Sequence, residues 1–326
     1  MELVSIVIPA YNAEKTIHRC INSLLHQDYD NIQVVVINDG STDNTDRIVK
    51  ELCLRDSRIK YLLTENGGVS KARNNGLDIA DGEYITFADS DDYAEKNYVS
   101  EMMGAIKKYN VDFCCCQSYD YFFRNGKKCI VKKKEREDTI LRAEEYDIMD
   151  IDFPTCVWGT MIKKELLNGI RFDTDIYVSE DTLFIAKVIR NTDKIVILHK
   201  NLYHYFQYSG SSFHGAYNKK RRTEFIAQRR IMRLFKDVPN VYINCRAFYA
   251  DKCLKVVRRY YFHMGVSECF YKKMLAEYRR NIKYILIRAV KKKNIRDIVM
   301  WFAYLIFAII PISYPLYYKM RYHVEE

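Results

Sequence analysis

Glu83-Tyr84-Ile85-Thr86-Phe87-Ala88-Asp89-Ser90-Asp91-Asp92 runs from an apolar, β-prone segment straight into three carboxylates. Like charges this close repel one another unless a cation lies between them. Asp89 and Asp91, with the small Ser90 between them, can reach from a strand end toward a divalent metal or toward the polar groups of a ligand. Mg²⁺ and Mn²⁺ prefer oxygen ligands, and Mg²⁺ is usually shared between one or two carboxylates and substrate phosphates. A lone Asp-x-Asp is more often a solvated acidic turn, so the surrounding sequence has to decide.

The sequence around this stretch alternates apolar runs with amphipathic segments. Apolar runs predict strands over residues 3 to 8, 33 to 38, 59 to 63 and 84 to 88. Helical spacing predicts helices over residues 13 to 26, 42 to 54 and 70 to 80. Repeated strand-helix alternation is typical of a parallel sheet covered by helices. We therefore expect an α/β fold with a mostly parallel sheet.

Three polar turns follow strands of this sheet. They are Pro9-Ala10-Tyr11-Asn12, Asn38-Asp39-Gly40-Ser41 and Asp89-Ser90-Asp91. In open α/β sheets, ligands bind beyond the carboxyl ends of the strands. The three turns are therefore expected to meet at one edge and to form a binding site.

The region from residue 110 to 200 is less regular. An aromatic and then basic segment over residues 119 to 136 predicts a loop or a hairpin. Helices are expected over residues 143 to 151 and 163 to 168. A further helix is expected to begin at Glu180, with Ser179 as its N-cap.

The charge of the chain is unevenly distributed. Of its 326 residues, 48% are hydrophobic, which is enough for one large or two medium domains, and the formal net charge is +10. Residues 1 to 200 hold 27 Lys and Arg against 34 Asp and Glu, whereas residues 201 to 326 hold 25 against 8, a net charge of +17. A basic region of this kind attracts either nucleic acid or anionic lipid.

An apolar segment near the C-terminus favours lipid over nucleic acid. Residues 298 to 318 are 21 residues without a formal charge and would extend ~31 Å as a helix, close to the hydrocarbon thickness of a bilayer. Pro311 and Pro315 interrupt the run, and basic residues flank it on both sides. An interfacial or re-entrant segment is favoured over a true span, and a buried core helix is the third alternative.

The cysteines and the N-terminus predict a reducing, cytoplasmic setting. Ten cysteines are present, three of them adjacent at 114 to 116, and none forms a Cys-x-x-Cys pair. The first residues lack a basic leader, and their apolar run is too short for a signal peptide. The cysteines are therefore expected to be ordinary buried residues.

Four ordered segments carry a family resemblance: Ser5-Ile6-Val7-Ile8-Pro9-Ala10-Tyr11-Asn12, Val36-Ile37-Asn38-Asp39-Gly40-Ser41-Thr42-Asp43, Asn66-Gly67-Gly68-Val69-Ser70-Lys71-Ala72-Arg73-Asn74-Asn75-Gly76 and Phe87-Ala88-Asp89-Ser90-Asp91-Asp92. Together they resemble the family 2 glycosyltransferases of the GT-A fold. The resemblance is densest over residues 3 to 100 and weakens toward Ser212. It implies a catalytic domain over residues 1–212. The basic tail lies outside the resemblance, and its charge and apolar run predict a basic helical region over 213–297 and an apolar membrane-associating segment and tail over 298–326.

The resemblance implies an inverting transfer of a sugar from a nucleotide donor, most often a UDP-sugar, to an acceptor hydroxyl. Asp91, assisted by Asp89, would bind the Mg²⁺ or Mn²⁺ that bridges the diphosphate. Asp39 would accept a hydrogen bond from the base. The nucleotide-sugar site implied in this way consists of Pro9, Tyr11, Asp39, Lys71, Arg73, Asp89 and Ser90.

Inversion needs a base on the face opposite the leaving group. The resemblance implies Asp181 in this role, with Glu180 as the near alternative; the other interpretation is an acidic pair favoured by the helix dipole. Trp158 would stack on the acceptor sugar or pack in the core. His204 or His214 would complete the metal shell or be an ordinary polar histidine.

These expectations combine into a metal-dependent glycosyltransferase at the cytoplasmic face of the membrane. It would extend a lipid-linked glycan, such as a bacterial capsule, exopolysaccharide or other surface polymer. One alternative is a non-catalytic nucleotide-sugar-binding or scaffold protein of the same fold. A Rossmann dehydrogenase is disfavoured because Pro9-Ala10-Tyr11-Asn12 stands where Gly-x-Gly-x-x-Gly would be required. A nucleic-acid-binding tail is disfavoured by the apolar run.

Overall fold

The computed structural model describes residues 1–124, 127–150, 154–207, 218–261 and 265–309. The chain divides into two compact units, one of residues 1–146 and 152–214, and one of residues 147–151 and 215–326. The domain boundary expected after residue 212 falls within 208–217, outside the described residues.

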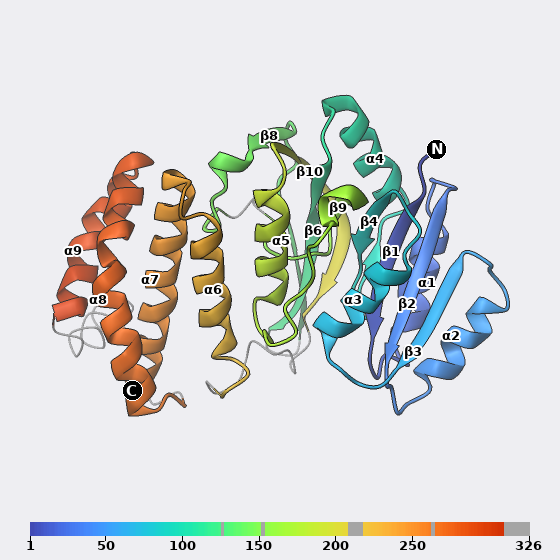
Figure 1. The fold of residues 1–326 in the computed structure, drawn as a ribbon, viewed down its shortest axis with the longest axis horizontal. Helices are drawn as coiled ribbons and strands as arrows, with labels where there is room; N and C mark the ends of the chain where they lie inside the picture. The colour runs from blue at the N-terminus through green and yellow to red at the C-terminus, as the bar shows by residue number, and fades with distance from the viewer. Residues whose placement is uncertain (125–126, 151–153, 208–217, 262–264, 310–326) are drawn as a thin grey trace. The chain divides into compact units, whose positions relative to one another are not determined.

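The first half of the sheet is parallel, as predicted. Strands β1 (Val4–Ala10), β2 (Ile32–Asp39), β3 (Ile59–Thr64) and β4 (Tyr84–Phe87) pair in the order β3-β2-β1-β4. Figure 1 shows these strands among the helices α1 (Ile17–Leu25), α2 (Thr45–Cys53), α3 (Val69–Ile79) and α4 (Tyr98–Tyr109). Every residue of β1 is buried, as expected for a central strand that is covered on both faces.

The second half of the sheet is mixed, which corrects the expectation of a mostly parallel sheet. Strand β9 (Thr160–Lys163) runs antiparallel between β4 and β6 (Phe113–Arg124), and β6 then pairs in parallel with β10 (Lys194–Phe206). Strand β5 (Tyr93–Ala94) and strand β8 (Thr139–Arg142) both pair antiparallel with β10. The predicted hairpin is confirmed by the antiparallel pairing of β6 with β7 (Lys127–Lys132).

Helix α1 shows why the predicted helices pack on the sheet. Its buried residues are Ile17, Cys20, Ile21 and Leu24. This i, i+3, i+4, i+7 spacing places the four side chains on one face. Burying each of the large aliphatic ones is worth roughly 1.5–3 kcal/mol.

The prediction of a helix over residues 143 to 151 is wrong for residues 143–150, which the structure describes. Only a 3₁₀ turn, η1 (Ala143–Glu145), forms. Tyr146 then adopts an extended ψ of 121°, and Asp147, which is 2% exposed, forms an ion pair with Arg288 at 2.9 Å. A tertiary interaction therefore overrides the local helical pattern. The segment expected at 163 to 168 is likewise a short 3₁₀ helix, η2 (Lys164–Leu167).

Helix α5 (Glu180–Arg190) begins at the predicted residue, but not by the predicted cap. Ser179 has a positive φ of 65°, and its side chain makes no capping hydrogen bond. A left-handed residue before the helix turns the chain sharply. Glu180 and Asp181 consequently occupy the first turn of α5.

The second unit is helical, as predicted, with α6 (Thr223–Leu234), α7 (Pro239–Tyr261), α8 (Glu268–Lys291) and α9 (Ile295–Ile309). Helix α9 packs against α8, where Arg279 Nε donates to the carbonyl of Ala308 at 2.6 Å and Trp301 Nε1 donates to the carbonyl of Ile282 at 3.3 Å. None of the helices in the described ranges combines the length and the apolarity needed to cross a membrane. Residues 310 to 318 of the predicted apolar segment lie outside the described residues.

Candidate active site

The predicted meeting of the three polar turns is confirmed. The backbone N–H of Asn12 donates to Ser41 Oγ at 3.0 Å, and Asn12 Oδ1 accepts the N–H of Thr42 at 2.8 Å. On the other side of β1, the N–H of Ala88 donates to the carbonyl of Val7 at 3.0 Å. Because β1 lies between β2 and β4, the turns after these three strands are neighbours at one edge of the sheet.

The three carboxylates after β4 lie in different surroundings. Asp89 Oδ1 accepts a hydrogen bond from Arg73 Nη2 at 2.9 Å. Asp92 is fully buried, and its two oxygens accept from the N–H of Phe206 at 2.8 Å and from the hydroxyl of Tyr203 at 2.9 Å. Asp91 is partly exposed, and within the described part of the chain no other residue donates to its carboxylate. The structure thus separates the three carboxylates, and it gives the buried Asp92, for which the sequence predicts no role, two hydrogen bonds to β10.

Asp91 and Asp89 fit a hard divalent cation. Burial first, and then the charge of Asp89, raise the pKa of Asp91 to about 6. A cation beside the two carboxylates would relieve this repulsion. In the described ranges, no cluster of three or more His, Cys, Asp or Glu could hold a metal. Mg²⁺ is commonly bound by one or two carboxylates, and phosphate and water supply its remaining ligands.

His204 does not complete this shell, which excludes one of the two expected histidines. Its Nδ1 is bonded to the Tyr121 hydroxyl at 2.8 Å and its Nε2 to Glu95 Oε1 at 2.8 Å. The ring stacks between Tyr93 and Tyr119, with centroids 4.0 and 4.6 Å away. Because both nitrogens are engaged and the residue is 6% exposed, His204 is a core histidine. His214 lies outside the described residues.

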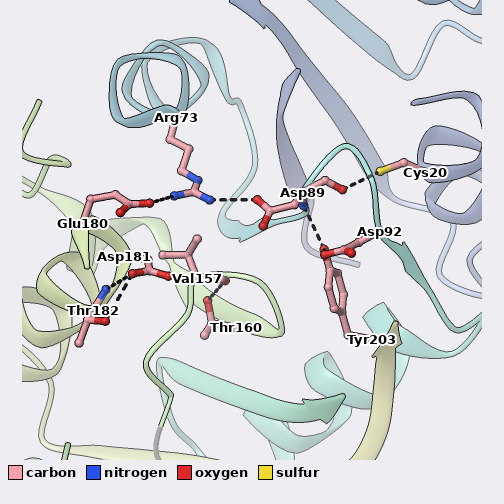
Figure 2. A network of polar contacts seen from close by, with 10 residues as sticks. All are labelled: Cys20, Arg73, Asp89, Asp92, Val157, Thr160, Glu180, Asp181, Thr182 and Tyr203. Carbon is pink, nitrogen blue, oxygen red and sulfur yellow. Dashed lines mark hydrogen bonds and ion pairs between the residues drawn. The ribbon is translucent and has the colours of Figure 1, made fainter. Parts of the chain in front are cut away.

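Arg73 joins the acidic turn to the start of α5 (Figure 2). Besides its bond to Asp89, its Nη1 lies 3.2 Å from Glu180 Oε1, a partner 107 residues away in sequence. The guanidinium also lies 5.4 Å from the centre of the Phe172 ring. The side chain is 5% exposed; burial opposes its charge, but Asp89 and Glu180 together raise its pKa above the usual value. Arg73 therefore remains charged and brings the two acidic groups into one site.

Glu180 and Asp181 form a coupled acidic pair beside this arginine. Burial first, and then the charge of Asp181, raise the pKa of Glu180 to about 7, and burial also raises the pKa of Asp181. Asp181 Oδ1 accepts the N–H of Thr182 at 2.7 Å, while no described residue donates to Oδ2. A carboxylate oxygen without a donor and with a raised pKa is suited to accept a proton near neutral pH.

The predicted nucleotide residues lie on β1, β2 and α3. Asp39 is 4% exposed, and its two oxygens accept the N–H groups of Gly67 and Gly68, both at 2.8 Å. It thus fastens the loop before α3, and each oxygen keeps a second lone pair for a ligand. Pro9 is buried in β1, whereas Tyr11 after it is 52% exposed. Lys71 is exposed on the first turn of α3, and Ser90 is partly exposed; none of these positions tests the expected roles.

Trp158 lies close to the acidic turn. It forms a parallel bridge with Phe87, two residues before Asp89. Its ring stacks on Tyr203 at 5.1 Å and on Tyr205 at 4.9 Å. It is partly exposed, and its role toward an acceptor stays a prediction.

Tyr203 is the residue that sequence reasoning missed. Its hydroxyl accepts the N–H of Asp89 at 3.0 Å in addition to donating to Asp92. In the sequence, only the histidine of Leu202-Tyr203-His204-Tyr205 indicates a function. The alternation of aromatic residues on a strand could have placed Tyr203 and Tyr205 on one face. Nothing local in the sequence, however, relates that face to a turn more than 100 residues earlier.

Comparisons with known proteins agree with this geometry. The model of the family described as "Glycosyl transferase family 2" matches residues 5–168, about half of the chain. The chain is 34% identical over 216 residues to glycosyltransferase GlyA of Streptococcus pneumoniae serotype 4, covering 64% of this chain and 31% of GlyA. It is 31% identical over 222 residues to glycosyltransferase GlyG of the same organism, covering 64% of this chain and 72% of GlyG. The chain thus spans about a third of GlyA but most of GlyG.

A third relative also has solved structures. The poly(ribitol-phosphate) beta-N-acetylglucosaminyltransferase TarS of Staphylococcus aureus is 32% identical over 204 residues, covering 62% of this chain and 35% of TarS. The crystal structure of TarS residues 1–349 in complex with UDP superposes with a TM-score of 0.66 at 22% identity, covering 92% of this chain and 90% of that one. This superposition shows a shared fold. From the matched family model and the GlyG alignment, this chain belongs to glycosyl transferase family 2.

Proposed function

We propose that this chain transfers a sugar from a UDP-sugar to a hydroxyl of a lipid-linked glycan, with inversion, in the synthesis of a bacterial surface polymer. The observation that carries the proposal is the bridge of Arg73 between Asp89 and Glu180, which joins the acidic turn after β4 to an acidic pair in which the pKa of Glu180 is raised. A UDP-sugar donor is supported by the crystal structures of TarS in complex with UDP and with UDP-GlcNAc.

On the donor side, Asp91 and Asp89 would hold Mn²⁺ or Mg²⁺ against the diphosphate. When bound, such a cation stabilises the negative charge that develops on the leaving group. Ser90 and the exposed Lys71 would contact the diphosphate or the sugar, in the manner expected of this family. The nucleoside would lie against Pro9, Tyr11 and Asp39.

On the acceptor side, Asp181 would take the proton of the attacking hydroxyl. Glu180 is the weaker candidate because its Oε1 is paired with Arg73, whereas Asp181 Oδ2 accepts from no described residue. Transfer to a carboxylate helps late, when the hydroxyl has become more acidic as its bond to the sugar forms. Attack from the side opposite the leaving diphosphate inverts the sugar's configuration.

Release of UDP tests this function. The purified chain would be incubated with Mn²⁺, a polyprenyl-linked glycan and, in turn, each of a panel of UDP-sugars. We expect release with one donor and its loss in Asp91→Asn. The matched control is Asp78→Asn, which alters an exposed ion pair with Arg171 and should keep the activity. A rise in melting temperature with UDP and Mn²⁺, but no release from any donor, would favour the non-catalytic scaffold.

Helix α9 supports a location at a membrane surface. Four exposed apolar residues are spaced seven, four and three apart, so that they share one face: Ile295 at 76%, Phe302 at 62%, Ile306 at 51% and Ile309 at 66% exposure. The 15 described residues of α9 extend ~22 Å, and a helix with one apolar face is suited to lying in the interface. The net charge of +17 over residues 201 to 326 favours an anionic lipid surface.

Vesicle co-sedimentation of the full chain tests the location. We expect binding to vesicles that contain anionic phosphatidylglycerol, weaker binding to neutral vesicles, and a loss in the double variant Phe302→Ser, Ile306→Ser. The control Leu54→Ser removes an apolar side chain that is 89% exposed in the first unit and should bind as the parent does. Equal binding of all three proteins, or tighter binding to RNA than to vesicles at the same salt concentration, would reject this location.

A further inference from the structure

The hydroxyl of Tyr203 joins the two ends of the acidic turn. It accepts the N–H of Asp89 at 3.0 Å and donates to Asp92 Oδ2 at 2.9 Å, as Figure 2 shows. The N–H of Asp92 donates in turn to the carbonyl of Asp89 at 3.1 Å. Tyr203 is 0% exposed, so water does not compete for these bonds. The turn is therefore closed by its own backbone and by one side chain from β10.

Asp92 completes the attachment to β10. Its other oxygen, Oδ1, accepts the N–H of Phe206 at 2.8 Å. With both oxygens engaged and 0% exposure, this carboxylate is not accessible to a ligand. The third acid of the sequence therefore has a different task from Asp89 and Asp91: it ties the turn to the sheet.

Helix α1 holds the same turn from the other side. Arg19 donates through Nη2 to the carbonyl of Asp91, and its guanidinium lies 4.4 Å from the centre of the Phe206 ring. Cys20 Sγ donates to the carbonyl of Asp89 at 3.4 Å. The carbonyls of the turn are thus held from α1, and an amide and a carboxylate are held from β10.

We propose that Tyr203 is a positioning residue, which acts with Asp92 and Arg19 to hold the carboxylates of Asp89 and Asp91 in the arrangement that binds the diphosphate and its cation. The inference rests on the proposed function and adds residues that do not touch the donor. Misplacing a binding group by about 1 Å can cost about 100-fold in activity. Fixing the backbone on both sides of Asp91 prevents such a displacement.

Tyr203→Phe tests the proposal because it removes the hydroxyl but keeps the ring that stacks on Trp158. The matched control is Tyr98→Phe. Tyr98 is also 0% exposed, its hydroxyl is bonded to Thr86 at 2.6 Å, and its ring centre lies 6.1 Å from that of Tyr203. Both variants lose a buried hydroxyl and leave its partners unsatisfied, so both should show a comparable fall in melting temperature. Only Tyr203→Phe releases the turn.

The readouts are calorimetric binding of UDP in the presence of Mn²⁺ and the steady-state kinetics of the holoenzyme. Tyr203→Phe should weaken UDP binding and raise the KM for the donor by about 10- to 100-fold, with a smaller change in kcat. Tyr98→Phe should lose comparable thermal stability and keep both constants. Equal binding by the two variants would overturn the proposal, whereas a parent protein that binds no UDP would instead reject the proposed function.

A second variant keeps the test decisive if Tyr203→Phe does not fold. Arg19 is exposed, so Arg19→Met should fold as the parent does. It removes the donor to the carbonyl of Asp91 and should weaken UDP–Mn²⁺ binding in the same direction, by a smaller factor. Because the proposal requires the turn to be held from both sides, unchanged UDP–Mn²⁺ binding in Arg19→Met would overturn it.

Discussion

Each unit of this chain buries a cluster of charges, and the two clusters differ in their balance. In the second unit, Asp147 is 2% exposed and pairs with both Arg288 and Lys292. Burial favours its protonation, but the two cations keep the pKa of Asp147 below its usual value. The carboxylate is therefore satisfied, and the ion pairs attach Asp147 to the C-terminal end of α8.

The cluster in the first unit has too few cations. Arg73 pairs with Asp89 and Glu180, whereas in the described residues neither Asp91 nor Asp181 forms an ion pair; the nearby charges of Arg19 and Arg73 only partly offset the burial of these two carboxylates. The pKa values of Asp91 and Glu180 are raised to about 6 and about 7. Such an imbalance costs stability and is typical of functional sites. The comparison teaches that burial alone does not mark a site, whereas a deficit of countercharge does.

The largest effect is expected in the first unit, where the buried acidic residues outnumber the cations. Asp181→Asn removes the proposed proton acceptor, so kcat should fall by about 10²- to 10⁴-fold. Calorimetric binding of UDP with Mn²⁺ should remain within a few fold, because Asp89 and Asp91 are untouched. A Glu180→Gln variant that loses more activity than Asp181→Asn would reverse the two roles.

Asp147→Asn tests the balanced side, where stability should fall and chemistry should not. The substitution leaves Arg288 and Lys292 without their carboxylate, at a cost of about 3–5 kcal/mol, less if the partly exposed Lys292 finds water. Because the folded pKa of Asp147 lies below the unfolded value of about 3.9, its contribution is present above that pH and is lost as the pH falls through the folded pKa.

Urea unfolding of Asp147→Asn at pH 7, with sugar transfer measured at a temperature where it stays folded, separates the two effects. Unchanged urea stability would show that the ion pairs contribute nothing net. If the folded variant lost sugar transfer, the cluster around Asp147 would have a functional role, and the two units would not differ in the way described.

The smallest expected effect is on the pH dependence of kcat/KM. A protonated pair cannot accept the acceptor's proton, so kcat/KM should rise with pH up to about 7 and then level off, changing about tenfold per unit on the acid side. Glu180→Gln removes a negative charge beside Asp181, whose pKa should then fall because Arg73 still acts on it. The rise of kcat/KM with pH should therefore occur at lower pH in this variant. If kcat/KM rose over the same pH range in both proteins, the rise would be assigned to another titrating group.

The parts of the site that follow strands in sequence could be predicted, because strand-turn patterns are local. Alternating apolar runs indicated β1 to β4, and the turns after them contain Asp39, Asp89 and Asp91. The resemblance added Asp181 at a helix start, which the structure places beside Arg73.

The other parts of the fold and of the site depend on contacts between segments that are distant in sequence. The antiparallel insertion of β9 carries no local signal, and it determines which strands β6 and β10 adjoin. Arg73 reaches Glu180 across 107 residues, and Tyr203 reaches Asp89 across 114. The failed helix after Ala143 has the same cause, because a long-range ion pair of Asp147 outweighs a local pattern.

The shared guanidinium of Arg73 has a consequence for how changes in this site combine. Its planar fork serves Asp89 with one nitrogen and Glu180 with another, and a lysine ammonium could not present the same two directions. Substitutions at Asp89 and Glu180 should therefore not be additive in a double-mutant cycle. The effect of a substitution at either acidic residue should therefore depend on which residue occupies the other position.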